Sequence, residues 1–260
     1  GLFSYFKNPD KETVLTPWRV VNMHMSDCLG GYDFFDENHD QMIDEPRYVD
    51  QGKETEEILN KSSKVLEINS KTGLYPLYIT YSMYRNKCNE YLEKDLNNEL
   101  KENLWLDTVK DNVFVVCKTP MAQAITKRTL VGFKNASVNT RHFDDLINQL
   151  KNKSNQFIDK ITNPMKWKLK GVDKMEFNAI VGNPPYQQMD GGNGASSSPV
   201  YNYFIEQYKK INPQYLSMII PARWYVGGKG LENFRSEMLN DKHIKKLFDY
   251  GNSQDVFNGV

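Results

Sequence analysis

The sequence predicts an α/β fold in which a mostly parallel sheet is covered by helices on both faces. From residue 60 onward, strand signals and helix signals alternate, which is the pattern of a parallel sheet with helical crossovers. The strand signals are short apolar runs, as expected for strands that are buried on both faces. A chain of 260 residues is long enough for one sizeable core, alone or with a small appendage.

The expected elements follow one another along the chain. Residues 1–60 are predicted to be an irregular or helical lead-in, in which Thr16-Pro17 opens a helix, because proline fits the first turn. Strands are expected at Lys64–Ile68, Asn112–Cys117, Ala136–Asn139, Phe177–Val181, Tyr215–Ile220 and Lys245–Tyr250. Helices are expected at Pro76–Leu100, Ala122–Leu130, Phe143–Ile161, Val200–Ile211 and Leu231–Asn240. The Gly- and Ser-rich stretch 191–198 is predicted to be a flexible loop, either a lid that orders with substrate or a disordered surface loop.

The charge balance and the cysteine and histidine spacing argue against several kinds of protein and site. The 33 basic and 33 acidic residues balance, so the chain has no global basic field that would hold a nucleic acid. Acidic residues gather in 33–57 and lysines in 151–174; solvated faces are the favoured interpretation, with phosphate contacts as the alternative for the lysines. The 3 cysteines and 4 histidines lack the spacing of a disulfide framework or a metal site. Without a signal peptide or a long apolar run, the chain is expected to be cytoplasmic.

The segment Asn183-Pro184-Pro185-Tyr186 directly follows the predicted strand Phe177–Val181. In parallel α/β sheets, ligands collect at the carboxyl ends of the strands. The two prolines fix φ and remove two N–H donors, so the carbonyl groups around them stay available as acceptors. Asn183 adds a side-chain carbonyl and Tyr186 adds an aromatic face, a set that fits a planar group with an exocyclic amine, such as adenine. A proline turn after a strand is the purely structural alternative.

The segment FNAIVGNPPYQ at 177–187 resembles motif IV of the amino-group DNA methyltransferases that use S-adenosylmethionine. Three further segments are similar to this family: Thr16-Pro17 with the apolar residues after it, the cofactor-loop region VLEINSKTGL at 65–74, and the later strand and loop within 216–230. The closest resemblance is to the methyltransferase portion of restriction–modification enzymes of the Eco57I type. The order of these segments is that of the γ arrangement, in which target recognition comes last.

This resemblance implies a Rossmann-like, three-layer αβα methyltransferase domain over 61–260, preceded by the lead-in 1–60 that carries Thr16-Pro17. It implies a reversed last strand and a target-recognition domain beyond Val260, so the chain is expected to be C-terminally incomplete. A nuclease domain elsewhere in a longer protein is left open. These residues contain no two-metal constellation of carboxylates and lysine, so this part of the protein is not expected to cut DNA.

The resemblance also implies an activity: transfer of a methyl group from S-adenosylmethionine to the N6 amine of adenine in DNA, with no metal required. The Asn183 side-chain carbonyl and the Pro184 backbone carbonyl would accept the two amine hydrogens, with Pro185 holding the turn, and so stabilise the charge that develops on nitrogen. An adenine in a duplex must be flipped out of the stack, and Tyr186 is the expected stacking face. Phe257 matches a second aromatic of the base pocket, and packing in the core is an equally open role for it.

The resemblance places the cofactor against Thr16, Glu67, Asn69, Gly73, Thr119, Asp144 and Asn183. The loop departs from the usual Asp-Pro-x-x-Gly-x-Gly pattern, since 67–73 keeps one acidic residue and one glycine; a generic strand-to-helix turn would explain Gly73 equally well. The next strand ends without the usual ribose-binding carboxylate, which leaves Thr119 or a backbone group for that contact. Asp144 matches the residue that contacts the cofactor adenine, although Asp145 competes for this role and either residue is a candidate helix N-cap.

Two other classes of function remain open. One is an RNA or protein-glutamine methyltransferase, because the same tetrapeptide serves RNA adenine and planar amides in similar enzymes. The other is a non-catalytic DNA-binding module that keeps the methyltransferase fold, which the altered cofactor loop motivates and the intact tetrapeptide opposes. The Thr-Pro segment before the cofactor loop favours DNA, and Asn rather than Ser at position 183 favours adenine over cytosine N4.

Overall fold

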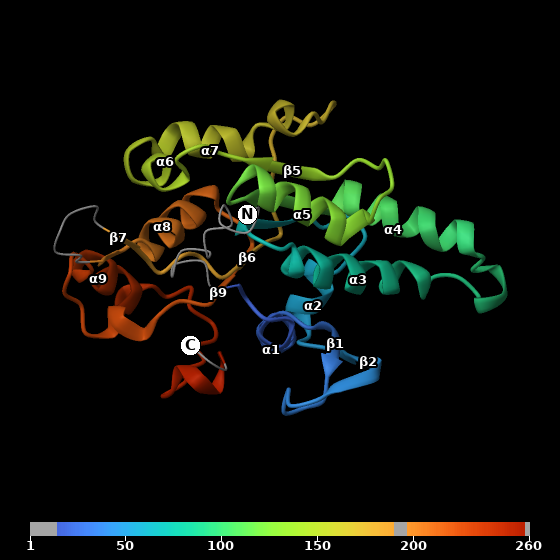
Figure 1. Ribbon diagram of the computed structural model, residues 1–260, viewed down its shortest axis with the longest axis horizontal. Helices are drawn as coiled ribbons and strands as arrows, with labels where there is room; N and C mark the ends of the chain where they lie inside the picture. Colours follow the sequence, from blue (N-terminus) through green and yellow to red (C-terminus); the bar gives the residue numbers. More distant parts are fainter. Residues whose placement is uncertain (1–14, 190–196, 258–260) are drawn as a thin grey trace, which may run out of the picture.

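The computed structural model describes residues 15–189 and 197–257. Its centre is a five-stranded, entirely parallel sheet with the strand order β5-β4-β3-β6-β9. The strands of this sheet are β3 (Val65–Ser70), β4 (Val113–Cys117), β5 (Asn139–His142), β6 (Ala179–Gly182) and β9 (Tyr215–Met218). Helices and 3-10 turns connect the strands and cover both faces of the sheet (Figure 1). The predicted α/β fold class is therefore confirmed.

Two layers of helix enclose this sheet. The α-helices are α1 (Trp18–Cys28), α2 (Lys53–Ile58), α3 (Leu74–Cys88), α4 (Asn98–Asn112), α5 (Pro120–Val131), α6 (Leu146–Asn152), α7 (Ser154–Thr162), α8 (Tyr201–Ile211) and α9 (Glu232–Asn240). The 3-10 helices are η2 (Glu93–Asp95), η3 (Pro164–Trp167), η4 (Ala222–Tyr225) and η5 (Ser253–Asp255). Two small antiparallel pairs lie outside the main sheet, β1 (Gly31–Phe35) with β2 (Met42–Val49), and β7 (Gln187–Met189) with β8 (Ser197–Pro199).

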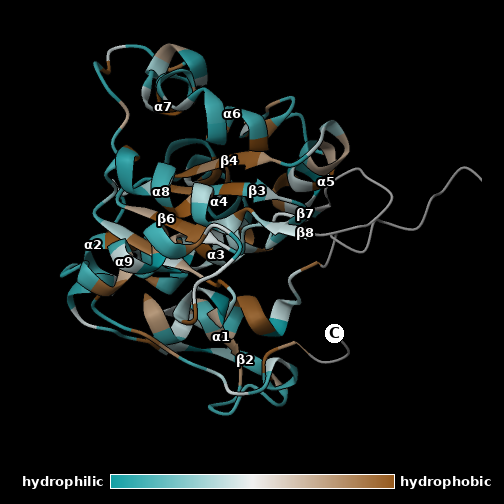
Figure 2. Cartoon of the chain, turned by 90° about the vertical axis from the view of Figure 1, so that its left-hand side faces the viewer, coloured by the Kyte–Doolittle hydropathy of each residue, from teal (hydrophilic) through white to brown (hydrophobic). Residues whose placement is uncertain are grey.

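Alternate residues of the central strands pack on opposite faces of the sheet. Leu66, Phe114 and Ile180 join the apolar cluster that lies under α6, α7 and α8. Val65 and Val113 join the cluster on the other face, with side chains from α1, α2 and α3. In Figure 2 the central strands are largely hydrophobic, and they lie between helices that carry many hydrophilic residues. Each such side chain contributes about 1.5–3 kcal/mol on full burial, so this sandwich is the main source of stability.

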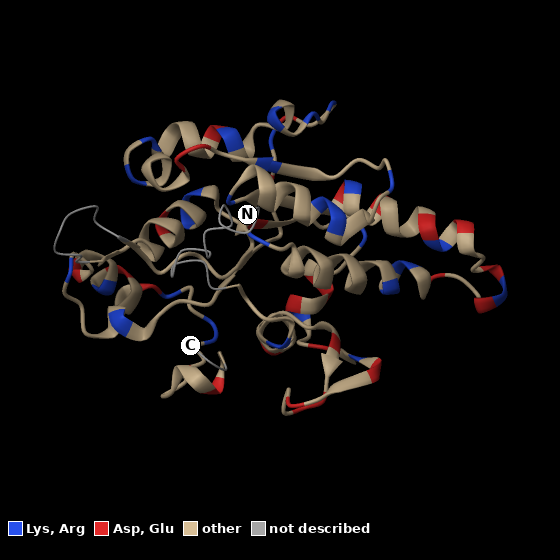
Figure 3. Cartoon of the chain, viewed as in Figure 1, with Lys and Arg blue, Asp and Glu red and all other residues tan. Residues whose placement is uncertain are grey.

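From residue 15 onward, the lead-in contains more regular structure than the sequence predicts. Thr16-Pro17 does open a helix, since α1 begins at Trp18 and the Pro17 carbonyl accepts a hydrogen bond from the Val21 amide. The β1–β2 hairpin was not predicted, and Asp33, in the acidic stretch, is fully buried rather than solvated. Arg47 and His39 each place a side-chain nitrogen 2.8 Å from Asp33 Oδ2, so the buried charge is compensated within the hairpin. Other acidic residues along this hairpin, red in Figure 3, are mostly exposed.

Several element boundaries differ from the expectations. The predicted helix Pro76–Leu100 is two helices, because α3 ends at Cys88 and the Asn97 side chain caps a new helix by accepting from the Leu100 amide. The predicted helix Phe143–Ile161 is likewise divided into α6 and α7 at Lys153. The strand expected at Ala136–Asn139 starts at Asn139 instead.

The strand predicted at Lys245–Tyr250 is wrong, because this segment is irregular and exposed. Lys245 forms an ion pair with Glu54, and Lys246 donates to Gln51, so the segment is tied by its side chains to the lead-in and not to the edge of the sheet.

Most of the loop predicted at 191–198 lies outside the described residues. Among the helices that are described, none has the length and the apolar character needed to cross a membrane.

Candidate active site

The loop after β3 forms one wall of a pocket at the carboxyl edge of the sheet. A β-bulge interrupts the pairing of β3 with β4 after Ile68, and Asn69 there adopts a left-handed conformation with φ of +73°. Gly73, with φ of +78°, precedes α3, and a Cβ at this position would lie 3.0 Å from the nearest atom of Thr126. The Thr129 hydroxyl, also on α5, donates to the Thr72 carbonyl at 2.7 Å. Close contact with α5 therefore fixes the path of the loop and explains its glycine.

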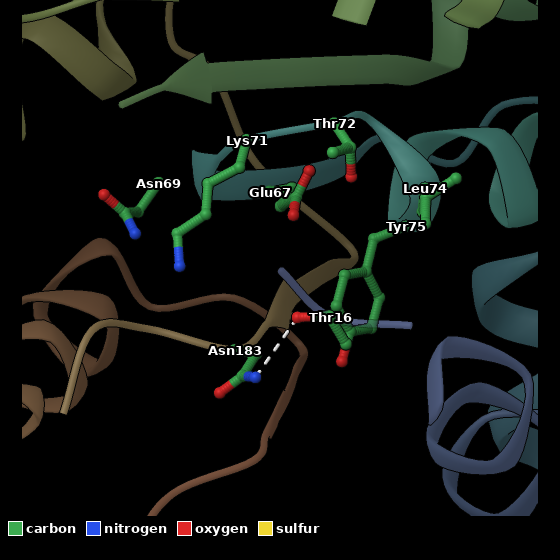
Figure 4. Close-up of a pocket in the computed structure, with 8 residues that line it drawn as sticks. All are labelled: Thr16, Glu67, Asn69, Lys71, Thr72, Leu74, Tyr75 and Asn183. Carbon is green, nitrogen blue, oxygen red and sulfur yellow. Dashed lines mark hydrogen bonds between the residues drawn. The ribbon is translucent and has the colours of Figure 1, made fainter. Parts of the chain in front are cut away.

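The pocket joins this loop to the start of the Asn183-Pro184-Pro185-Tyr186 segment (Figure 4). Its lining residues are Thr16, Glu67, Asn69, Lys71, Thr72, Leu74, Tyr75 and Asn183. Three polar atoms of this lining, Glu67 Oε2, Asn69 Nδ2 and Asn183 Oδ1, are buried and have no hydrogen-bond partner among the described residues. An unsatisfied buried polar group costs about 1–3 kcal/mol, so three in one pocket indicate a site for a polar ligand.

Asn183 follows β6 directly, and its orientation is set from the other end of the chain. Its Nδ2 donates to the Thr16 hydroxyl at 3.1 Å, a contact between residues 167 positions apart. This hydrogen bond uses the amide nitrogen and leaves Oδ1 as a buried acceptor (Figure 4). Thr16 and Asn183 were both predicted as site residues, and the structure brings them together.

The rest of the tetrapeptide lies between β6 and the β7–β8 pair. Pro184 is buried, while Pro185 and Tyr186 are half-buried. The Tyr186 carbonyl accepts a hydrogen bond from the Val200 amide at 3.1 Å, which connects the segment to the start of α8. Burial raises the pKa of the Tyr186 hydroxyl to about 12, so this side chain is neutral at physiological pH.

Two ionisable side chains, one acidic and one basic, belong to the loop wall of this pocket. Burial raises the pKa of Glu67 to about 8, although a hydrogen bond with Ser70 and the charge of Lys71 act in the opposite direction. Burial also lowers the pKa of Lys71 to about 8; Lys118 acts in the same direction and Glu67 opposes it. Both pKa values lie near the physiological range, which is typical of functional sites.

A buried series of hydrogen bonds holds Tyr75, one of the lining residues, in place. The hydroxyl of Tyr75, a lining residue, lies 2.7 Å from His24 Nδ1, and His24 Nε2 lies 2.8 Å from the Ser217 hydroxyl. Burial lowers the pKa of His24 to about 4, so the imidazole is neutral at physiological pH. His24 is therefore a buried core residue. The sequence did not predict the lining residues Lys71, Thr72, Leu74 and Tyr75, although all four lie close to the predicted Gly73.

The family model described as Eco57I restriction-modification methylase matches residues 111–257, more than half of this chain. The chain belongs to this family. The matched region contains Asn183 and Tyr186 but not the loop 67–73, so the interpretation of that loop depends on its geometry.

One curated relative of this family member is described as an "uncharacterized adenine-specific methylase" from Mycoplasma pneumoniae (strain ATCC 29342 / M129 / Subtype 1). It is 36% identical over 88 residues, which are 32% of this chain and 20% of the relative. The similarity thus spans about a fifth of the relative's length.

The remaining predicted residues of this methylase-family chain do not line the pocket. Thr119 is exposed at the end of β4 and caps α5 by accepting from the Ala122 amide at 3.0 Å. Asp144 is exposed after β5, and Asp145 precedes α6 without a side-chain capping bond. Phe257 is half-buried and packs beside Val256 on α1. In the described part of the chain, no group of three or more His, Cys, Asp or Glu side chains is placed to hold a metal ion.

Proposed function

We propose that this protein transfers a methyl group from S-adenosylmethionine to the N6 amine of adenine in DNA, as the modification part of a restriction–modification enzyme. The observation that carries the proposal is Asn183 Oδ1. It is a buried acceptor at the carboxyl end of β6, it has no partner among the described residues, and Thr16 holds its amide in one orientation. Membership of the Eco57I methylase family and the adenine-specific description of the relative support the same reaction.

The residues of the pocket fit the proposed cofactor. The amino-acid end of S-adenosylmethionine carries an ammonium group, and the unsatisfied Glu67 Oε2 is an acceptor suited to it. Thr16, Asn69 and Gly73 belong to the same wall or to the loop that forms it. When bound, S-adenosylmethionine supplies a methyl group on a positively charged sulfur. Thr119 and Asp144 follow β4 and β5 at the same edge of the sheet as Glu67, and we retain them as proposed contacts of the nucleoside moiety.

The role of the protein in the chemistry follows from the acceptors. The exocyclic nitrogen of adenine is a poor nucleophile, because its lone pair is delocalised into the ring. Asn183 Oδ1 and the Pro184 carbonyl would accept its two hydrogens, localise the lone pair and stabilise the positive charge that develops. Preorganised dipoles of this kind contribute about 10²–10³ in rate. They carry the developing charge without a metal ion, so the proposed reaction requires none.

Reaching the amine requires the adenine to leave the DNA stack. We assign the stacking contact to Tyr186, whose neutral ring is half-buried beside Asn183, with Pro185 fixing the backbone between them. Phe257 is retained as a proposed second aromatic contact, although its packing on α1 already accounts for its position.

The proposal includes an organisation for the longer protein. The lead-in 1–60 supplies Thr16, and the methyltransferase domain begins at residue 61. A target-recognition domain, and a nuclease domain if the enzyme also cleaves, would belong to other parts of the protein. DNA is the proposed partner and the cytoplasm the proposed location.

The Asn183→Ala variant of the complete protein tests this function. We expect transfer of labelled methyl groups to DNA to fall at least about a hundredfold, because the variant lacks the acceptor in the transition state. The affinity for S-adenosylmethionine is expected to stay nearly intact. Asn152→Ala, the same change on the exposed surface of α6, is the matched control and should leave both quantities unaltered.

Comparing acceptors distinguishes the alternatives. Methyl transfer to RNA or to a glutamine-containing protein, with none to DNA, would replace the proposed substrate. Full activity of Asn183→Ala on DNA would exclude the mechanism. A folded protein that binds DNA but not S-adenosylmethionine would be a non-catalytic module.

A further inference from the structure

Lys71 lies in the same pocket as the unsatisfied atoms, in the loop position where the usual motif is rich in glycine. Its side chain is half-buried and extends from the end of β3 between Asn69 and Glu67 toward Asn183 (Figure 4). Neither membership of the family nor the proposed transfer chemistry assigns it a role.

The polar groups in the loop wall of the pocket include both hydrogen-bond donors and an acceptor. Lys71 Nζ and Asn69 Nδ2 are donors, and Asn69 Nδ2 is buried with no partner among the described residues. Glu67 Oε2 is an unsatisfied acceptor in the same wall. Donors and an acceptor within one small pocket match a ligand that carries an anionic and a cationic group on neighbouring atoms. An α-amino acid in its zwitterionic form has this arrangement.

The backbone and the charges of the loop favour the same ligand. Asn69 has φ of +73°, a conformation that is uncommon outside glycine, and its side chain lines the pocket (Figure 4). The pKa of Lys71 is lowered mainly by burial and also by Lys118, so its charged form is disfavoured in the ligand-free protein. A bound carboxylate would offset this effect, since an opposite charge at short range favours the ionised form. A phosphate fits less well, because it offers mainly acceptors and would leave Glu67 Oε2 without a donor.

We propose that Lys71 and Asn69 bind the carboxylate of the amino-acid moiety of the methyl donor, while Glu67 accepts hydrogen bonds from its ammonium group. This inference rests on the proposed function, because it assigns the amino-acid end of S-adenosylmethionine to this wall. It makes Lys71 a specificity-determining residue, since a site built to pair with a group rejects an analogue that lacks it.

Calorimetry at pH 7 tests the assignment with two ligands, S-adenosylmethionine and its decarboxylated analogue, which differ by the carboxylate alone. We expect the wild-type protein to bind S-adenosylmethionine roughly tenfold to a hundredfold more tightly than the analogue, as is typical for a hydrogen bond between charged groups. Lys71→Met should remove most of this preference by weakening only the binding of S-adenosylmethionine. Lys118→Met is the matched control: it removes a neighbouring lysine outside the pocket lining and should keep the preference.

Each other result overturns the inference in a recognisable way. Equal affinity of the wild-type protein for both ligands would show that the carboxylate has no partner, and this comparison needs no variant. An equal loss for both ligands in Lys71→Met, in a protein with unchanged thermal unfolding, would show a general structural role. If the wild-type protein binds neither ligand, the proposed cofactor itself is wrong, and the inference fails with it.

Discussion

Replacing Glu67 by glutamine changes how the stability of this protein depends on pH. Glu67 is 8% exposed, and burial raises its pKa from 4.5 to about 8. Between these values the folded protein holds a proton on Glu67 that the unfolded chain has released. The free energy of unfolding therefore falls as the pH rises through this window, and the contribution is complete only below pH 4.5. A glutamine side chain cannot titrate, so Glu67→Gln removes this dependence.

The expected change in the free energy of unfolding follows from the difference between the folded and unfolded pKa values of Glu67. Each pH unit corresponds to about 1.4 kcal/mol for one proton. Between pH 5.5 and pH 7.5, wild-type protein should lose about 2.5 kcal/mol relative to Glu67→Gln. Other groups interact electrostatically with Glu67, but the hydroxyls of Tyr75 and Tyr208 and the Cys117 thiol have raised pKa values and stay neutral over this range. Lys71, with a pKa of about 8, stays mostly charged.

Urea unfolding of both proteins at fixed ionic strength measures the difference directly. Any pH-independent cost of burying the glutamine amide shifts the two curves apart without changing their relative slope. A difference that stays constant within about 0.5 kcal/mol from pH 5.5 to pH 7.5 would refute the reasoning, because Glu67 would then be ionised in the folded protein.

Two further substitutions separate backbone constraint from chemistry. Gly73→Ala should lower the free energy of unfolding by about 1 kcal/mol or more, because φ at this position is +78° and a Cβ would lie 3.0–3.3 Å from atoms of Thr126; an unchanged free energy in urea unfolding would contradict this. Tyr186→Phe should methylate DNA at nearly the wild-type rate, whereas Tyr186→Ala should lose roughly tenfold to a hundredfold in kcat/KM, since stacking contributes about 1–3 kcal/mol per base; similar losses in both would assign the role to the hydroxyl.

The parallel sheet could be predicted from the sequence because its strands carry their own signal. Val113–Cys117 and Ala179–Gly182 are apolar runs that are buried on both faces, so their composition alone identifies them. The β1–β2 hairpin has no such signal, because β2 is largely polar and half-exposed. Its register depends on contacts with residues far along the chain, such as the Tyr32 amide donating to the Ser82 hydroxyl. The apolar residues of 245–250 show the converse, since a strand-like composition forms a strand only where an edge pairs with it.

The candidate site was likewise predictable only in part from the sequence. Resemblance placed Asn183, Glu67 and Thr16 in one site, and the pocket contains all three. The hydrogen bond that orients Asn183 joins residues 167 positions apart, so no local pattern could reveal it. Lys71 was missed for a different reason. A lysine in a loop is usually solvated, and only the packing of the loop against α5 shows that this side chain is held in a pocket.

The distribution of unfavourable features argues that the loop is more than a generic strand-to-helix turn. A generic turn accounts for Gly73, but it gives no reason for the buried Glu67 carboxyl or for the left-handed backbone of Asn69. Six buried side-chain atoms lack a partner among the described residues, and three of them line this one pocket while the other three belong to α8. The three pocket atoms lack a partner among the described residues, and a bound polar ligand would supply one. Folded proteins retain such groups mainly at functional sites, where the strain belongs to the mechanism. The same geometry that makes Glu67 unfavourable alone would make it a strong acceptor for a bound ammonium group.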